Sequence, residues 1–143
     1  MQHEKSCGAL VFRKNPINGK EYVLMVRNRH GRFYSFPKGH MEKGETEIMT
    51  AEREVREETS VSIQIQSDFR QTVSYSPMAG VEKEVVYFLA KTRQTSIRPR
   101  EGEIEEVRWI PLEKALSVLT HENDKKVLLS ALEARKRENS ETV

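Results

Sequence analysis

The chain of 143 residues has few of the features that mark secreted, membrane or disordered proteins. Its single cysteine excludes a disulfide within a monomer, which is consistent with a reducing compartment. It has no long apolar run and no signal-peptide pattern, so we expect neither membrane insertion nor secretion. With seven glycines and five prolines it has no low-complexity linker. We therefore expect one domain over residues 1–143, located in the cytoplasm.

The chain also lacks a strong net charge. Its 24 Lys and Arg residues nearly balance its 22 Asp and Glu residues, which leaves a formal charge of +2. This balance does not predict binding to nucleic acid through bulk electrostatics. The one cysteine, Cys7, lies in the apolar run CGALVF and is interpreted as a buried strand residue, in preference to a nucleophile.

The hydrophobic pattern predicts an α+β domain. The expected strands are residues 4–13, 21–28, 61–76 (one strand or a pair), 82–92 and 103–110, and the expected helices are 47–59, 112–119 and 123–137. An Asn18-Gly19 pair between the first two strands favours a hairpin.

Three carboxylates crowd one sector of the helix expected at 47–59. Glu54, Glu57 and Glu58 are spaced i, i+3 and i+4, so they lie within an arc of roughly 100°. Four residues of this helix are expected to face the core: Ile48, Ala51, Val55 and Thr59. Like charges at this spacing repel, whereas a hard cation would stabilise them, and Mg²⁺ or Mn²⁺ prefers such oxygen ligands. The alternative is a solvated acidic helix face.

The residues around this helix favour the metal site. The segment reads Gly39, five residues, Glu45, seven residues, Arg53-Glu54-Val55, one residue, Glu57-Glu58, one residue, Ser60-Val61. It resembles the signature of the Nudix hydrolases at every fixed position except the last, where the family has glycine and this chain has Ser60. The resemblance implies the Nudix fold: an α/β/α sandwich with a central mixed β-sheet and a loop-helix-loop catalytic motif.

The Ser60 position matters because the family glycine closes the helix in a left-handed conformation. Serine can adopt that conformation at a cost of roughly 1 kcal/mol. We expect a modest effect on stability and little effect on chemistry.

The resemblance assigns metal binding to the helix glutamates Glu54, Glu57 and Glu58 and adds a glutamate from a distant loop. Glu103 is the candidate, because it lies six residues before Trp109, as in diadenosine-tetraphosphate hydrolases. It would be a metal ligand or the general base. Glu105 and Glu106 are competitors, and any of the three could instead be a solvated loop charge.

Arg53 and Gly39 are expected to organise the site. The Arg53 guanidinium can hold Glu45 in a bidentate ion pair, with Glu57 as a local competitor. Gly39 is expected to bend the chain so that its backbone approaches the metal or a phosphate.

Lys38 and His40 flank Gly39 in the sequence Pro-Lys-Gly-His, which is similar to that of asymmetric dinucleoside-tetraphosphate hydrolases. Extra positive charge here suits a long polyphosphate chain. The alternatives are a solvated loop cation for Lys38 and a turn residue for His40.

Tyr75 and Tyr87 could stack on adenine rings, and Lys83 could contact phosphate. The alternative for Tyr87 is packing within the sheet. Three further cations, Arg27, Arg29 and Arg32, either steer anions or are simply solvated. Trp109 is expected in the core. No role is assigned to His3, His30 or His121.

Together these features predict a Mg²⁺-dependent pyrophosphohydrolase, with Mn²⁺ as a possible substitute. The expected substrate is a dinucleoside polyphosphate, with diadenosine tetraphosphate split into ATP and AMP. Neither a nucleic-acid nor a membrane partner is expected, and the protein would be a monomer or homodimer. The rival enzymes are a (d)NTP pyrophosphatase, an inositol-pyrophosphate phosphatase and an RNA 5′-end pyrophosphohydrolase. Two non-enzymatic alternatives are a nucleotide sensor on the same fold and an interaction domain that uses the C-terminal basic helix.

Overall fold

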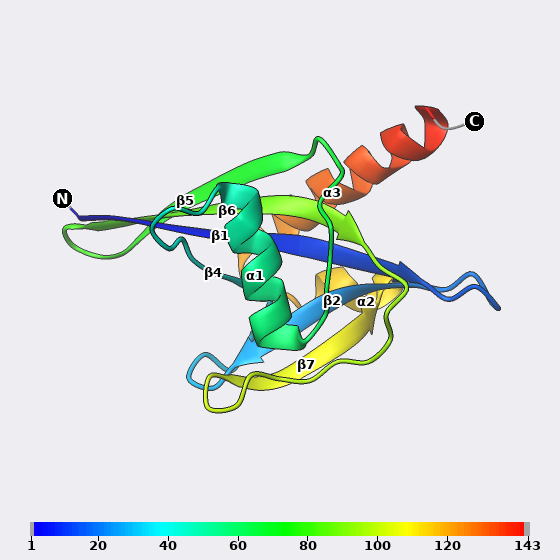
Figure 1. Cartoon of the computed structure of the whole chain (residues 1–143), viewed down its shortest axis with the longest axis horizontal. Helices are drawn as coiled ribbons and strands as arrows, with labels where there is room; N and C mark the ends of the chain where they lie inside the picture. The colour runs from blue at the N-terminus through cyan, green and yellow to red at the C-terminus, as the bar shows by residue number, and fades with distance from the viewer. Residues whose placement is uncertain (1, 142–143) are drawn as a thin grey trace.

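A computed structural model describes residues 2–141, in which seven strands form one sheet and three helices pack against it (Figure 1). The strands are β1 (Gln2–Lys14), β2 (Glu21–Asn28), β3 (Tyr34–Ser35), β4 (Lys38–His40), β5 (Arg70–Met78), β6 (Val81–Lys91) and β7 (Ile104–Pro111). The helices are α1 (Glu47–Thr59), α2 (Leu112–Val118) and α3 (Glu122–Glu141). The predicted domain of residues 1–143 stays a prediction, and residues 1, 142 and 143 lie outside the described part.

The sheet is mixed. Its strand order is β3-β2-β1-β6-β5, with β4 pairing with β1 and β7 pairing with β2. Strands β1 and β6 are parallel, while the other paired strands are antiparallel. Strands β1 and β2 form the predicted hairpin, with Gly19 in its turn at a φ of 73°, a conformation that favours glycine.

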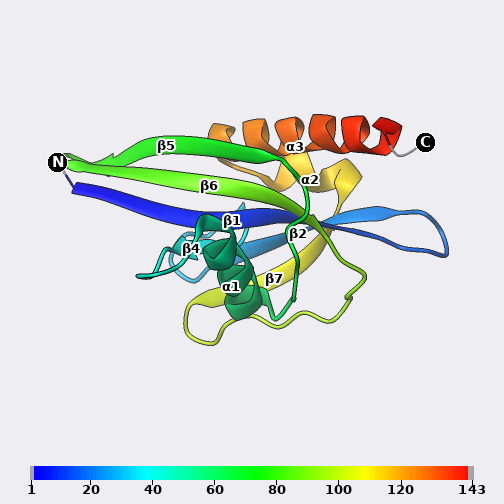
Figure 2. The same ribbon diagram turned by 45° about the horizontal axis from the view of Figure 1, so that its top comes forward.

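Alternate residues of the central strands fill two cores. Leu10 and Phe12 of β1 belong to the core under α2 and α3, whereas Ala9 and Val11 belong to the core under α1. Figure 2 shows the sheet between α1 on one side and α2 and α3 on the other. The predicted α/β/α sandwich with a central mixed sheet is therefore confirmed. Cys7 is fully buried in β1, as expected, and burial raises the pKa of its thiol to about 11.

The prediction of a strand throughout 61–76 is wrong for its first half. Strand β5 begins at Arg70, and residues 61–69 form an extended segment outside the sheet. Ile63 and Ile65 still pack on the core under α1, which explains the alternating pattern. The Ile65 N–H donates to the Glu52 side chain at 2.9 Å. Apolar and polar residues alternate here because the segment lies along a core, although it does not form the hydrogen bonds of a strand.

The helix predicted at 47–59 has those bounds, and three of its four predicted core residues are fully buried: Ala51, Val55 and Thr59. Ile48 is a correction, because it lies in the first turn and is 41% exposed. No helix within residues 2–141 is long and apolar enough to cross a lipid bilayer.

Candidate active site

Both ends of α1 are fixed by short-range hydrogen bonds. At the start, the Thr46 hydroxyl accepts the Met49 N–H at 3.1 Å, so it caps the helix. At the end, Ser60 adopts the left-handed conformation with a φ of 66°, and its N–H donates to the Arg56 carbonyl at 2.8 Å. The expectation that serine would enter the conformation of the family glycine is confirmed. The helix therefore ends where the motif requires.

Two of the three helix carboxylates are buried. Glu54 and Glu58 are only 7% and 5% exposed, while the Glu57 side chain is about one-third exposed. A solvated acidic face therefore does not describe Glu54 or Glu58. Burying a carboxylate is costly unless it is paired or coordinates a cation, so a compensating partner is required at this position.

Arg53 joins four groups around the carboxylates. Its Nε and Nη2 donate to the two oxygens of Glu45 at 2.6 and 3.0 Å. Its Nη1 donates to Glu54 at 2.7 Å and to Glu57 at 2.9 Å, and Nη2 also reaches the His40 carbonyl at 2.9 Å. The bidentate pair with Glu45 and the competing contact with Glu57 are both made. The Arg53 guanidinium lowers the pKa of Glu45 to about 2.

Gly39 makes room for Glu54. It lies in β4, paired with Cys7, so the expected bend at this residue is wrong. A Cβ on Gly39 would lie 2.0 Å from Cδ of Glu54 and 2.1 Å from its Oε2. Gly8 of β1 likewise makes room for the neighbouring segment, because a Cβ at this position would lie 2.2 Å from the Pro37 carbonyl oxygen. The two glycines let β4 sit close to β1 on one side and to α1 on the other.

The buried carboxylates resist ionisation. Burial raises the pKa of Glu58 to about 8, although its Oε1 accepts the Lys38 backbone N–H at 3.1 Å, which favours the charged form. Burial also raises the pKa of Glu54, against the attraction of Arg53. A bound cation would favour the charged forms of both residues.

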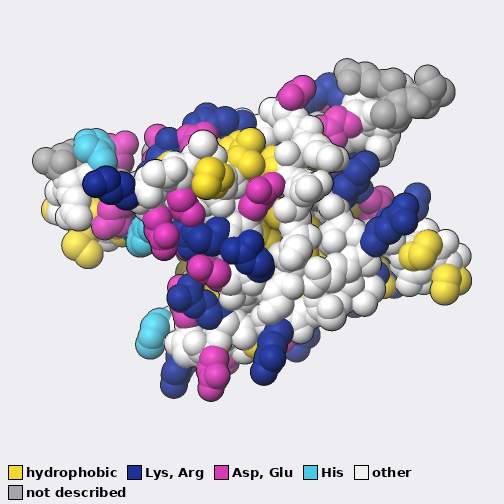
Figure 3. Space-filling view, in the orientation of Figure 1, with side chains coloured by type: hydrophobic (Ala, Val, Ile, Leu, Met, Phe, Trp, Pro, Cys, Tyr) yellow, Lys and Arg dark blue, Asp and Glu magenta, His cyan; other side chains and the backbone are white. Residues whose placement is uncertain are grey.

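These groups open onto one cleft of about 670 Å³. Its charged lining comprises Glu42, Glu54, Glu57, Glu58, Glu103, Arg29, Lys38, Arg53, Lys83 and Arg100, with His30 and His40. Figure 3 shows acidic and basic side chains interleaved on the face that carries α1. Mixed charges suit a ligand that brings both metal cations and phosphate anions.

Among the three distant glutamates, the structure brings Glu103 to the cleft, in the turn before β7. Arg100 Nε lies 3.2 Å from Glu103, and Arg100 Nη1 lies 3.4 Å from Glu57, so one arginine joins the loop to the helix. Glu105 and Glu106 instead form ion pairs with Arg27 at 3.0 and 3.2 Å, outside the cleft lining.

Three predicted substrate-binding residues line the cleft: Lys38, His40 and Lys83. Tyr75 is 40% exposed and pairs across the strands with Lys83, but its side chain lies outside the cleft lining. Tyr87 is a correction. It is 1% exposed and packs edge-on against Phe36, so its ring has no free face on which a base could stack.

The three arginines predicted to form a basic loop after β2 differ in their surroundings. Arg29 lines the cleft, whereas Arg27 is committed to its glutamate partners and Arg32 adopts a left-handed φ of 59°. His30, to which the sequence assigned no role, also lines the cleft. In the sequence His30 has no partner at metal-ligand spacing, so its place in the cleft becomes visible only in the folded structure. Trp109 packs partly buried against the core under α1, as expected.

The residues fit a divalent cation in donor type and burial. Among the described side chains no three His, Cys, Asp or Glu residues converge on one point. In the cleft, Arg53 Nη1 lies between the carboxylates of Glu54 and Glu57. However, the same cleft holds several carboxylates, and the absence of a side chain at Gly39 gives the Glu54 carboxylate its place there. Carboxylate oxygens are the donors that Mg²⁺ prefers.

The fold and the motif define a Nudix domain, and the comparison with known families agrees. The chain belongs to the Nudix family: the NUDIX domain matches residues 3–132. Its enzymatic class is that of the Nudix hydrolases, which act on acid anhydrides of phosphorus.

Individual relatives are named for different substrates. The chain is 31% identical over 120 residues to the asymmetrical bis(5′-nucleosyl)-tetraphosphatase of Mus musculus, covering 78% of this chain and 81% of the relative. It is 34% identical over 132 residues to an 8-oxo-(d)GTP phosphatase of Mycolicibacterium smegmatis, covering 87% of this chain and 40% of that protein. A crystal structure of a C. elegans Ap4A hydrolase binary complex has a TM-score of 0.78 and 28% identity, covering 92% of this chain and 98% of the other.

Proposed function

We propose that the protein is a Mg²⁺-dependent hydrolase of dinucleoside polyphosphates, which splits diadenosine tetraphosphate into ATP and AMP. The observation that carries the proposal is the cleft, whose lining combines buried glutamates of α1 with the basic side chains of Lys38 and Lys83. The names of the mouse relative and of the C. elegans structure support the choice of substrate.

The metal ligands in this proposal are Glu54, Glu57 and Glu58, with Glu103 and the Gly39 backbone beside them. When bound, Mg²⁺ neutralises phosphate charge and lowers the pKa of water. The chain's own residues orient these ligands. Arg53 holds Glu54 and Glu57 through Nη1, and the Lys38 N–H holds Glu58. Glu103 is positioned by Arg100 and is the candidate general base.

Substrate binding is assigned to Lys38, His40 and Lys83. These side chains enter the cleft from β4 and β6, where they can neutralise a long phosphate chain. Tyr75 pairs across the strands with Lys83 and is 40% exposed, so it can stack on an adenine that extends past the cleft.

The second candidate is a (d)NTP pyrophosphatase, which the 8-oxo-(d)GTP phosphatase relative favours. A panel of substrates separates the two. Purified protein with Mg²⁺ would be given diadenosine tetraphosphate, dNTPs including 8-oxo-dGTP, triphosphorylated RNA and an inositol pyrophosphate, with products identified by chromatography. We expect the highest kcat/KM on diadenosine tetraphosphate. Turnover of dNTPs alone would overturn this substrate, and binding without turnover would favour a nucleotide sensor.

Carboxylate variants test the metal ligands in the same assay. Glu57→Gln and Glu58→Gln should each lower kcat by roughly 10²-fold or more, because a ligand charge is lost where charge develops in the transition state. Glu52→Gln is the matched control. It lies on the same helix, does not line the cleft, and its amide oxygen can still accept the Ile65 N–H. Equal loss in all three variants would show a folding defect and not a lost ligand.

A further inference from the structure

A second groove lies at the far end of the sheet, where the β1–β2 hairpin, the end of β6 and α3 meet. It consists of two adjoining cavities of about 710 and 380 Å³, which share the lining residues Gln64, Gln66, Lys91, Arg135 and Asn139. We call it the distal groove. Ser6 of β1 lines the active-site cleft and Phe12 of the same strand lines the distal groove. At about 3.3 Å per residue, these positions are roughly 20 Å apart, so the two sites are separate.

The larger cavity is strongly basic. Its lining contains five cationic side chains, Arg13, Lys14, Lys91, Arg93 and Arg135, and one carboxylate, Glu21. Glu21 is already paired with Arg135. The chain as a whole carries only +2, so positive charge is concentrated here, whereas the active-site cleft mixes both signs. Such a concentration of one sign raises the local concentration of anions.

Most of these cations have no acidic partner among the side chains that the structure describes. The structure shows no ion pair for Lys14, Lys91 or Arg93. Arg13 is held by aromatic rings: its guanidinium carbon lies 4.6 Å from the Tyr22 ring and 5.2 Å from the Trp109 ring. Its Nε is buried without a hydrogen-bond acceptor among the described residues. Arg13 therefore carries its positive charge against two aromatic rings, with no carboxylate in the described part of the chain to neutralise it.

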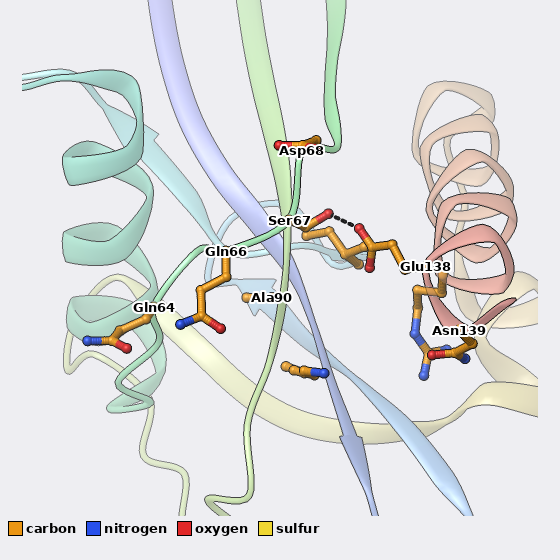
Figure 4. A pocket seen from close by; sticks show the side chains of 10 residues that line it. Gln64, Gln66, Ser67, Asp68, Ala90, Glu138 and Asn139 are labelled. Atoms are coloured by element: carbon orange, nitrogen blue, oxygen red, sulfur yellow. Dashed lines mark hydrogen bonds between the residues drawn. The ribbon is translucent and has the colours of Figure 1, made fainter. Parts of the chain in front are cut away.

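The smaller cavity supplies neutral polar groups. Figure 4 shows Gln66 on the wall formed by the segment after α1, and Asn139 on the opposite wall formed by α3. The far end of this cavity is closed by a hydrogen bond from the Ser67 hydroxyl to Glu138. Side-chain amides can donate to phosphate oxygens, while the acidic end disfavours an anion there. The basic end beside Lys91 is therefore the binding end.

We propose that the distal groove is a second anion site, which takes the phosphate chain of a small phosphate ester or polyphosphate. Arg13, Lys14, Lys91 and Arg93 supply the charge, and Gln64 and Gln66 supply amide donors. The arrangement of several cations along a groove suits a chain of phosphates better than a single carboxylate, because charges are spread along the cavity. This site is independent of the substrate proposed for the active-site cleft.

Binding of two probes, inorganic tripolyphosphate and ATP, tests the site. The full chain would be titrated in EDTA, which prevents metal-dependent turnover, and the amide signals of Gln64, Gln66 and Thr92 would be followed by NMR. We expect these signals to shift with both probes. Equal affinities for tripolyphosphate and ATP would show that the groove recognises the phosphate chain alone. Tighter binding of ATP would show that the groove also contacts the nucleoside. Shifts confined to residues of the active-site cleft would overturn the proposal.

Charge variants give the second measurement. Lys91 and Arg93 are both exposed, so the double variant Lys91→Gln/Arg93→Gln should fold and weaken binding at the distal groove by roughly tenfold or more. The matched control is Lys114→Gln/Arg137→Gln, which removes the same two charge types from positions outside the groove. It should change the affinity less than twofold. If the two double variants weakened binding equally, the affinity would depend only on the net charge of the protein, which would contradict a defined site.

Discussion

Replacing Gly39 by alanine should separate catalysis from stability. The new Cβ would lie 2.1 Å from Oε2 of Glu54, whereas carbon and oxygen atoms in contact lie roughly 3.5 Å apart. The carboxylate must therefore move by more than about 1 Å. A misplacement of this size in an active site costs roughly 10²-fold in rate. Because the obstacle is the far end of a side chain, the loss of folding stability should be only about 1 kcal/mol.

Gly8→Ala is the comparison. Its Cβ would meet backbone, 2.2 Å from the Pro37 carbonyl oxygen and 2.9 Å from Cα of Lys38, and backbone in a sheet cannot move as easily. We expect this variant to lose roughly 3 kcal/mol of unfolding free energy.

The assay pairs urea unfolding with kcat in Mg²⁺ and with Mn²⁺ affinity measured by electron paramagnetic resonance. Gly39→Ala should keep most of its stability but lose metal affinity and rate. Adding Glu54→Asp to Gly39→Ala shortens the displaced side chain, so stability should return while activity does not. Full activity in Gly39→Ala would refute the inference that Gly39 exists to seat the Glu54 carboxylate.

Three further outcomes follow from the contacts. Arg53→Lys should lower kcat by roughly 10- to 100-fold, because one ammonium group cannot replace a guanidinium that contacts both Glu45 oxygens and Glu54. A variant with unchanged kcat would contradict the organising role of Arg53. Ser60→Gly should raise the unfolding free energy, measured in urea, by about 1 kcal/mol without changing kcat, because glycine adopts the left-handed φ of 66° without strain. A variant less stable than the original protein would contradict the strain at Ser60. Arg70, with Lys5, lowers the pKa of Glu47 from 4.5 to about 2, so the unfolded chain binds the proton more tightly. The resulting stability is present above about pH 4.5 and is lost as the pH falls towards 2; Glu47→Gln should flatten this part of the stability profile, and an unchanged slope would exclude the ion pairs as its cause.

Helix α1 and its row of carboxylates were predictable because the information for them is local. The spacing of Glu54, Glu57 and Glu58, the apolar positions between them and the turn at Ser60 all lie within one short segment. The contact of Arg53 with Glu45 also follows from the motif, since the two residues are only eight positions apart, across the start of α1.

Other features depend on register between distant strands, which the sequence does not specify. Strand β4 has three residues, too few for any period, yet it brings the Lys38 N–H to Glu58. Tyr87 faces the core because β6 is in register with β1 so that Gly8 lies beside it. A shift by one residue would have turned its ring to the other face. The burial of Glu54 and Glu58 likewise follows from the close approach of β4, which Gly8 and Gly39 permit.

The central claim is that Glu54, Glu57 and Glu58 hold a divalent cation against a polyphosphate chain. The most direct measurement is a crystal structure with Mn²⁺ and a non-hydrolysable diadenosine tetraphosphate analogue, with anomalous scattering used to locate the metal. We predict Mn²⁺ bound by these three glutamates, with the phosphates beside Lys38 and Lys83. Manganese bound elsewhere, or phosphates in this cleft without any metal on the α1 glutamates, would contradict the account.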